Sequence, residues 1–358
     1  MASDPVPTPA PYLDPQNIDL GEQAGALLNG KQLNDLTPAQ ARKLFDQLQT
    51  PSPLHPDVSI SEHEITTAHG KMKTFVYRRK HIDLHEKLPF VYHVHGSGWI
   101  FGDAFDYTAF VCDIVVRTGF AVVFSQYSLA PETRFPVQEE QCLEVLEHVL
   151  KHGTEFGVKG DEVVLSGDSA GGQLVTAISI LSHERKLNLP IVHQVLWHPL
   201  VDSSSTGTRF SEFLFQNGPL LTTPFIQEAI SDYFGTDTKD RTSILTSPIL
   251  MSTQQVKEFM PSTTIITGQA DWLRDQGQDF GQLSQTAGVP CAILQEVACL
   301  HICEVFNKSR TSPTVELVMI GVCGKIKEVM SFDQKVDSEH QVEHEKAENG
   351  KPAKRRKR

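Results

Sequence analysis

One serine among three glycines is the first feature of this sequence that points to chemistry. Residues 167–172 read GDSAGG and follow the apolar run EVVLS. Glycines permit a turn in which side chains would collide, so the spacing predicts a sharp turn that presents Ser169. A strand, such a turn and a helix form a nucleophile elbow, G-x-S-x-G. An ordinary strand-to-helix turn is the alternative, and the pentapeptide alone does not exclude it.

A serine becomes nucleophilic when a base takes its proton, and a carboxylate must orient that base. Where such an elbow carries the serine, the chain order is Ser, then Asp or Glu, then His. Of the fifteen histidines, only His301, His340 and His344 follow the first plausible acid, Asp271. The last two fall in a polar tail that we expect to be disordered. Elimination therefore leaves His301 as the candidate base.

Two aspartates compete for the role of the acid. Asp271 follows the strand-like residues 263–268, whereas Asp275 stands where the next helix is expected to begin. An acid at that second place is typical of the first turn of a helix. Turn formation is the alternative role for a lone aspartate in a loop. The position of Asp271 between the serine and the histidine, at the end of a strand, favours it over Asp275.

Acyl transfer also needs hydrogen-bond donors for the developing oxyanion, each worth about 10² to 10³ in rate. Residues 93–99 read HVHGSGW, and glycines after a strand leave backbone N–H groups free to face a ligand. By itself this stretch is better interpreted as a plain glycine turn. An elbow later in the chain makes a donor loop the stronger interpretation.

The elements that must position these residues alternate along the chain. Strand-like and helix-like segments follow one another, which predicts an α/β fold with a mostly parallel sheet and helices on both faces. The expected strands are residues 89–95, 120–127, 162–166, 191–200, 263–268 and 291–297. The expected helices are residues 136–153, 170–187, 275–288 and 314–330.

Two segments interrupt the alternation. Residues 1–60 are rich in Pro, Leu and Gln, and residues 205–260 are helical and aromatic in pattern. We expect neither to supply strands and both to form a cap over one end of the sheet. The catalytic core would then comprise residues 70–204 and 261–332 of a single domain, followed by a disordered charged tail, residues 333–358.

Composition limits the class of protein. Hydrophobic residues make up 39% and charged residues 21%, typical of a globular protein with a substantial core. The net charge of −12 argues against general nucleic-acid binding. No apolar run is long enough for a membrane span, and the N-terminus lacks a secretory pattern. The six cysteines are expected to be reduced and buried, which predicts a cytoplasmic location; the C-terminal KPAKRRKR also leaves a nuclear one open.

Taken together, the motifs resemble the hormone-sensitive-lipase-like family of α/β-hydrolases, which includes microbial carboxylesterases and arylacetamide-deacetylase-like enzymes. The resemblance covers roughly residues 70–330, with the motifs in the family's order. The matching pieces are HGSGW (95–99), YSLAPE (127–132), RFP (134–136), GDSAGG (167–172), DWLRD (271–275) and the loop around His301.

The resemblance implies an α/β-hydrolase fold with a helical cap and a serine esterase without cofactor. It implies Ser169, Asp271 and His301 as the catalytic triad, and an oxyanion hole from the N–H groups of Ser97, Gly98 and Ala170. The substrate would be a carboxylic ester of small or medium size. A natural-product-tailoring enzyme that dehydrates, condenses or transfers acyl groups, a non-catalytic small-molecule receptor, and a homodimer all stay open.

Three features of this chain differ from the family pattern or suggest another site. Ser97 replaces the middle glycine of the family's HGGG, so a side chain now restricts the backbone there. Leu300 and Ile302 flank His301 where glycine is common, which predicts a narrowed pocket. Cys299, His301 and Cys303 alternate, but without the usual C-x₂₋₄-C spacing of zinc ligands, so we predict no metal.

Overall fold

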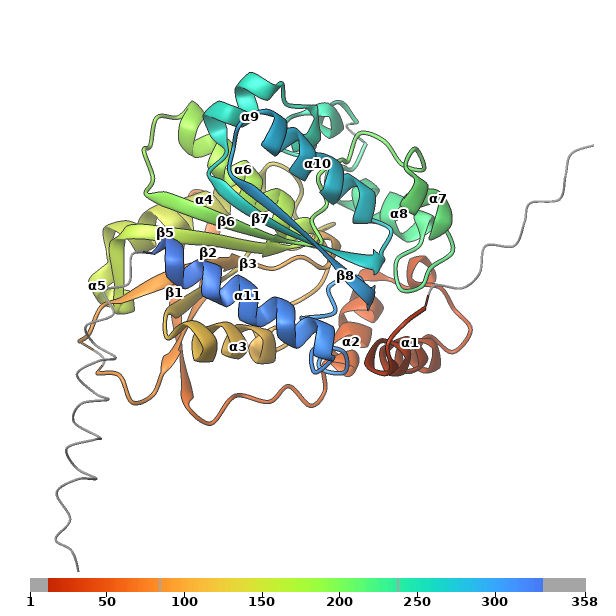
Figure 1. The fold of residues 1–358 in the computed structure, drawn as a ribbon, viewed down its shortest axis with the longest axis horizontal. Helices are drawn as coiled ribbons and strands as arrows, with labels where there is room; N and C mark the ends of the chain where they lie inside the picture. The colour runs from red at the N-terminus through yellow and green to blue at the C-terminus, as the bar shows by residue number, and fades with distance from the viewer. Residues whose placement is uncertain (1–11, 84, 237, 331–358) are drawn as a thin grey trace, which may run out of the picture.

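An eight-stranded sheet forms the centre of the protein (Figure 1). The computed structural model describes residues 12–330 apart from residues 84 and 237. The sheet has the order β1-β2-β4-β3-β5-β6-β7-β8, in which the pairs β1–β2 and β2–β4 are antiparallel and all others parallel. The strands are β1 (Val58–Thr67), β2 (Gly70–Arg79), β3 (Leu88–Val94), β4 (Ala121–Gln126), β5 (Val158–Asp168), β6 (Ile191–Trp197), β7 (Ser262–Ala270) and β8 (Cys291–Leu300). The predicted α/β class is confirmed.

Helices cover both faces of this sheet, as predicted. In Figure 1, α3 and α11 lie on one face, whereas α4, α6 and α10 lie on the other. Strands enclosed in this way are apolar along their whole length, and every residue of β3 is buried. The bounds are α3 (Thr108–Thr118), α4 (Val137–Lys151), α5 (Gly153–Phe156), α6 (Ala170–Glu184), α10 (Arg274–Thr286) and α11 (Pro313–Val329).

The hairpin of β1 and β2 is a part of the sheet that the sequence analysis did not identify. Its first strand begins at Val58, so the expectation that residues 1–60 supply no strand is wrong for residues 58–60. Much of β1 is exposed, because it is an edge strand with the polar stretch SEHE at its middle. A half-exposed edge strand lacks the apolar run that marks the buried strands.

Helices from the two predicted cap segments lie at the same end of the sheet (Figure 1). The N-terminal pair is α1 (Pro15–Leu28) and α2 (Pro38–Leu48), and the mid-chain pair is α7 (Phe210–Leu214) and α8 (Thr223–Phe234). Asp14, Thr37 and Thr222 cap α1, α2 and α8, each followed by proline in the first turn, which fixes where these helices begin. A further mid-chain helix, α9 (Thr253–Phe259), packs instead against α6 and α10.

Several expectations concern residues outside the described part of the chain. These are the tail of residues 333–358, its basic KPAKRRKR, and two of the three late histidines. Within residues 12–330, leaving out 84 and 237, no helix is long and apolar enough to cross a membrane. All six cysteines are free; five are buried as predicted, and Cys291 is half-buried.

Candidate active site

Ser169 sits on the turn between β5 and α6, and its backbone is strained. Its φ and ψ are 51° and −120°, a conformation that non-glycine residues rarely adopt. Strain of this kind persists only where the surroundings enforce it, and it occurs preferentially at functional sites. Ser169 is the N-cap residue of α6, whose positive N-terminal end faces this turn. The strand–turn–helix geometry is that of a nucleophile elbow.

Close backbone packing explains the glycines around this serine. A Cβ on Gly171 would lie 2.1 Å from the Val94 carbonyl oxygen. A Cβ on Gly96 would lie 2.2 Å from the Asp168 carbonyl oxygen and 2.9 Å from Ser169 Cβ. No side chain fits into such gaps, so glycine is required for the HGSG loop to pack directly on the elbow.

Asp168 joins the HGSG loop to the elbow, a role that the sequence analysis did not identify. It is fully buried, and its two oxygens accept hydrogen bonds from Tyr107 Oη at 2.8 Å and from the Gly96 N–H at 3.1 Å. Tyr107 Oη also lies 3.0 Å from Ser97 Oγ. The middle position of G-x-S allows any residue, so only the fold identifies Asp168 as the anchor of this loop.

The HGSG loop presents backbone donors beside Ser169. Ser97 and Gly98 have φ values of 57° and 62°, so the serine occupies a left-handed conformation that favours glycine. Ala170 is the first residue of α6, where an N–H has no partner within the helix. In the described part of the chain, the N–H groups of Ser97, Gly98 and Ala170 make no hydrogen bond to the protein. They are therefore free to bind an anion.

His301 and Asp271 meet at the carboxyl ends of two neighbouring strands. His301 directly follows β8, Asp271 directly follows β7, and His301 Nδ1 lies 2.9 Å from Asp271 Oδ2. Both side chains are buried, with 3% and 1% of their surface exposed. Burial by itself would raise the pKa of Asp271, but the charge of His301 and the hydrogen bond with His198 hold it below the usual value.

Asp275 lies in the first turn of α10, the place that the sequence analysis assigned to it. Its carboxylate accepts a hydrogen bond from the Ser211 N–H at 2.7 Å and pairs with the Arg274 guanidinium at 2.7 Å. No hydrogen bond in the described chain joins it to His301. Asp275 therefore connects α10 to the mid-chain helix α7, and Asp271 is the carboxylate beside the histidine.

The residues that flank His301 differ in their effect on the site. Ile302 lines the cavity beside His301 and has a φ of 45°, an uncommon value for a β-branched residue. Leu300 is fully buried and does not line the cavity. Its N–H instead donates to Asn17 Oδ1 of α1 at 2.9 Å. Only Ile302 is therefore placed to narrow the cavity, which stays a prediction, and Asn17 is a contact that the sequence did not indicate.

Ser169 and His301 both line a cavity of about 250 Å³. Its lining is mostly apolar and comes from three parts of the chain: the N-terminal helices, the mid-chain segment and the loops of the core. Core loops contribute Ser97, Gly98, Trp99, Phe101, Ser169, Leu200, His301, Ile302 and Phe306. The helical segments contribute, among others, Ala24, Leu28, Leu44, Leu48, Leu221, Phe225 and Ile226.

The alternating Cys299, His301 and Cys303 do not form one ligand set. Cys303 Sγ donates to Glu296 at 3.0 Å, while His301 Nδ1 faces Asp271. Among the described residues, no cluster of histidine, cysteine and carboxylate donor atoms within 4.8 Å of one another includes Cys299. The alternation in sequence thus does not bring the three side chains to one point.

Comparison with known proteins finds relatives and solved structures that share the fold described above. A family model for the α/β-hydrolase fold matches residues 91–304. An esterase from Gibberella moniliformis is 30% identical over 86% of this chain and 94% of its own length. An ethyl acetate hydrolase from Pseudomonas putida is 27% identical over 79% and 86% of the two chains. The crystal structure of a thermostable esterase from Pseudomonas putida ECU1011 matches with a TM-score of 0.83 and 26% identity, covering 91% of this chain and 100% of that one.

Proposed function

Since this chain belongs to the hormone-sensitive-lipase-like family of α/β-hydrolases and is a serine carboxylesterase, we propose that Ser169, Asp271 and His301 are its catalytic triad. The observation that carries the proposal is the 2.9 Å contact between His301 and Asp271, in a site where His301 and Ser169 line the same cavity. Base, orienting carboxylate and nucleophile are the three parts that acyl transfer by a serine needs. The esterase relatives favour hydrolysis over the tailoring and receptor alternatives.

In the proposed acylation step, His301 Nε2 removes the proton of Ser169 Oγ, which attacks the carbonyl carbon of the ester. His301 then gives this proton to the leaving alcohol as the C–O bond breaks, and an acyl-enzyme remains. A water molecule, deprotonated by His301, attacks the acyl group and releases the acid, returning the proton to Ser169. Asp271 accepts the Nδ1–H of His301 throughout, so it fixes the ring and stabilises its charged form.

We assign the oxyanion hole to the N–H groups of Ser97, Gly98 and Ala170. The free N–H groups at the N-terminus of α6 and in the left-handed HGSG loop support this assignment. Donors that are already fixed in place need no reorganisation when charge develops on the carbonyl oxygen. The Asp168 and Tyr107 contacts hold the loop against the elbow, so these two residues would position the donors without touching substrate.

A fluorophosphonate probe tests the proposed nucleophile. The purified protein should be labelled at Ser169, as located by mass spectrometry of its peptides, because only an activated serine attacks the phosphorus. Ser169→Ala should abolish labelling while the protein keeps its thermal unfolding midpoint. A folded wild-type protein that takes up no label, or labelling at another serine, would contradict the assignment.

We propose that the N-terminal helices α1 and α2 and the mid-chain helices α7 and α8, from the predicted cap segments 1–60 and 205–260, act as the cap and select compact acyl groups. A cavity of about 250 Å³ is at the small end for ligand sites, and residues of both segments line it. Each methylene that fits gains about 0.8 kcal/mol by burial, but further carbons must displace packed side chains.

We therefore expect p-nitrophenyl acetate or butyrate to be hydrolysed with a higher kcat/KM than the palmitate ester. A series of p-nitrophenyl esters from C2 to C16, assayed below their critical micelle concentrations, measures this preference. Efficiency that keeps rising through C12 and C16 would show that the cavity does not limit acyl length.

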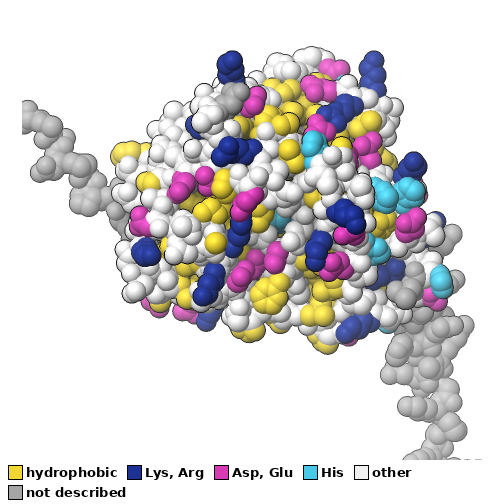
Figure 2. Space-filling model, turned by 180° about the vertical axis from the view of Figure 1, so that it is seen from behind, with side chains coloured by type: hydrophobic (Ala, Val, Ile, Leu, Met, Phe, Trp, Pro, Cys, Tyr) yellow, Lys and Arg dark blue, Asp and Glu magenta, His cyan; other side chains and the backbone are white. Residues whose placement is uncertain are grey.

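A nucleic-acid partner is not part of this proposal. The net charge of −12 would repel a polyanion. On the face shown in Figure 2, acidic and basic side chains are interspersed and do not form a basic stripe. Small-molecule esters are the expected partners of the site.

A further inference from the structure

A second histidine contacts the same carboxylate oxygen as His301. His198 directly follows β6, and its Nδ1 lies 3.1 Å from Asp271 Oδ2. The two imidazole rings are 5.5 Å apart between centroids and meet at 88°. The other oxygen, Asp271 Oδ1, accepts the Leu273 N–H at 2.9 Å. One carboxylate oxygen is therefore shared between two imidazoles, which the ester-cleaving steps described above do not require.

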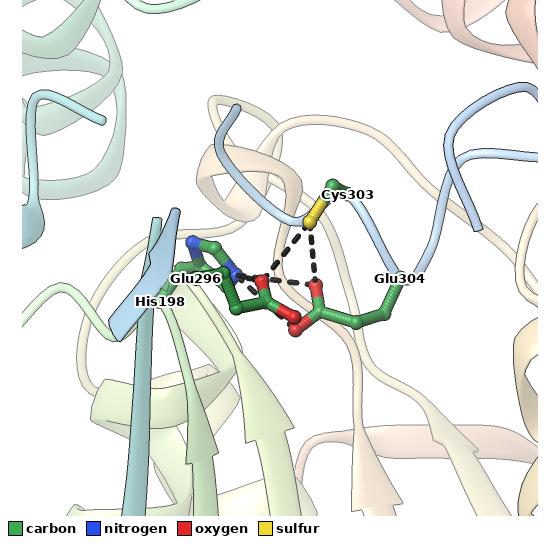
Figure 3. Close-up of side chains that lie close together, drawn as sticks. All are labelled: His198, Glu296, Cys303 and Glu304. Atoms are coloured by element: carbon green, nitrogen blue, oxygen red, sulfur yellow. Dashed lines mark hydrogen bonds and ion pairs between the residues drawn. The ribbon is translucent and has the colours of Figure 1, made fainter. Parts of the chain in front are cut away.

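The far side of the His198 ring faces two more carboxylates (Figure 3). His198 Nε2 lies 3.1 Å from Glu304 Oε2 and 3.2 Å from Glu296 Oε2. Cys303 Sγ completes the group, donating to Glu296 at 3.0 Å. The side chains of His198 and Glu296 are wholly buried, and that of Glu304 is 1% exposed. Solvent cannot screen these charges, so they must balance one another.

The surroundings of His198 favour its doubly protonated form. A neutral ring carries one proton, so one of its nitrogens would direct a lone pair at a carboxylate. One contact favours the neutral ring instead: the Gly268 N–H lies 3.1 Å from Nδ1 and donates to this nitrogen when it carries no proton. Burial opposes the charged ring, but the charge of Glu304 and hydrogen bonds to the nearby carboxylates raise the pKa of His198 well above its usual range.

The pKa values of the two glutamates are shifted in opposite directions. Burial, followed by the nearby charge of Glu304, raises the pKa of Glu296 to about 7. Burial acts in the same direction on Glu304, but the charge of His198 and its hydrogen bond lower the pKa of Glu304. The result is an ion pair between His198 and Glu304, with Glu296 largely protonated in acidic solution.

We propose that His198 is a positioning residue that acts through Asp271: as an imidazolium paired with Glu304, it holds the carboxylate and offsets part of the charge presented to His301. The proposal rests on the triad assigned above. Its consequence is that protonated His301 is less stabilised than it would be beside an uncompensated Asp271. Removing the charge of His198 should therefore change the pH dependence of activity.

His198→Gln tests this proposal, because an amide can still donate to Asp271 but carries no charge. We expect the acid limb of the kcat/KM profile to move to higher pH by about one unit, the low end for loss of a charge this close. When the charge of His198 is lost, Glu296 and Glu304 bind protons more readily, and this loss of negative charge limits the shift of the acid limb. Adding Glu304→Gln should move the limb back toward its wild-type position, because the second change removes one negative charge.

His193→Gln is the matched control. His193 is a buried histidine of β6, the strand that His198 follows, but its ring nitrogens face the hydroxyls of Ser262 and Thr264, each at 3.0 Å. The control should leave the acid limb in place. Lower activity of His198→Gln with an unmoved limb, or a limb that the double variant does not move back, would mean a structural role only and overturn the proposal.

A second measurement covers the case in which His198→Gln does not fold. Nitrogen-15 NMR of histidine-labelled protein should show, at pH 8, one imidazolium in the wild type that is missing from the charge-balanced His198→Gln/Glu304→Gln variant. A neutral ring at that position would overturn the proposal. Activity retained by Ser169→Ala in the same assays would instead refute the triad, so the two failures are distinguishable.

Discussion

Ser169→Ala and His301→Ala are each expected to lower kcat for ester hydrolysis by about 10⁵ to 10⁶-fold. Alanine at 169 leaves no group to form the acyl-enzyme. Alanine at 301 leaves the serine hydroxyl without a base, so the nucleophile stays protonated. Because the proposed nucleophile and base act as a unit, each single loss should cost nearly as much as the loss of both.

Neither change should lower the thermal unfolding midpoint by more than a few degrees. Alanine has the same restriction on positive φ as serine, so Ser169→Ala neither relieves nor increases the strain of the elbow. Steady-state kinetics with p-nitrophenyl butyrate and thermal unfolding followed by circular dichroism measure the two effects separately.

Ser179→Ala provides the matched control for the nucleophile. Ser179 is a buried serine of α6 that does not line the cavity, and it donates to the Val175 carbonyl at 3.4 Å. Its replacement should leave kcat within about twofold. If Ser169→Ala retained activity within tenfold of the wild type, Ser169 would not be the nucleophile.

Asp271→Asn is expected to lower kcat by about 10⁴-fold, less than the loss of Ser169 or His301. An amide can turn its NH₂ group toward His301 Nδ1, which then favours the tautomer whose Nε2 carries the proton and cannot act as base. It also no longer stabilises the imidazolium that forms during attack. Some basicity of the ring survives, which is why the loss is smaller.

Asp275→Asn separates this effect from general damage to the loop between β7 and α10. Asp275 pairs with Arg274 and accepts the Ser211 N–H, so its loss should lower the unfolding midpoint while kcat stays within tenfold. Both variants are compared in kcat and in thermal unfolding. If Asp275→Asn were the more damaging to kcat, the assignment of the acid to Asp271 would be wrong.

The local sequence pattern alone was enough to predict much of the fold of this protein. Continuous apolar runs predicted the buried parallel strands within a few residues, because a strand covered on both faces has no polar side to show. The glycines of GDSAGG and the chain order Ser169, Asp271, His301 predicted an elbow and its two partners. The tight turn at Ser169 is confirmed, because backbone geometry there restricts the residue types that can occupy it. The catalytic roles of the three residues stay a prediction. The edge strand β1 was not predicted, because it is largely exposed and has neither a continuous apolar run nor a turn that restricts its residue types.

Only the tertiary structure decided which polar groups surround the proposed triad. Nothing in the sequence near His198, Glu296 and Glu304 indicates that the two glutamates meet one side of the His198 ring while Asp271 meets the other. The same holds for Asn17, which ties α1 to the His301 loop across 283 positions in the sequence. Such contacts depend on the register and packing of elements far apart in the chain. The charge balance of a buried site is therefore a property of the assembled fold, since burial removes the water that would otherwise screen each group alone.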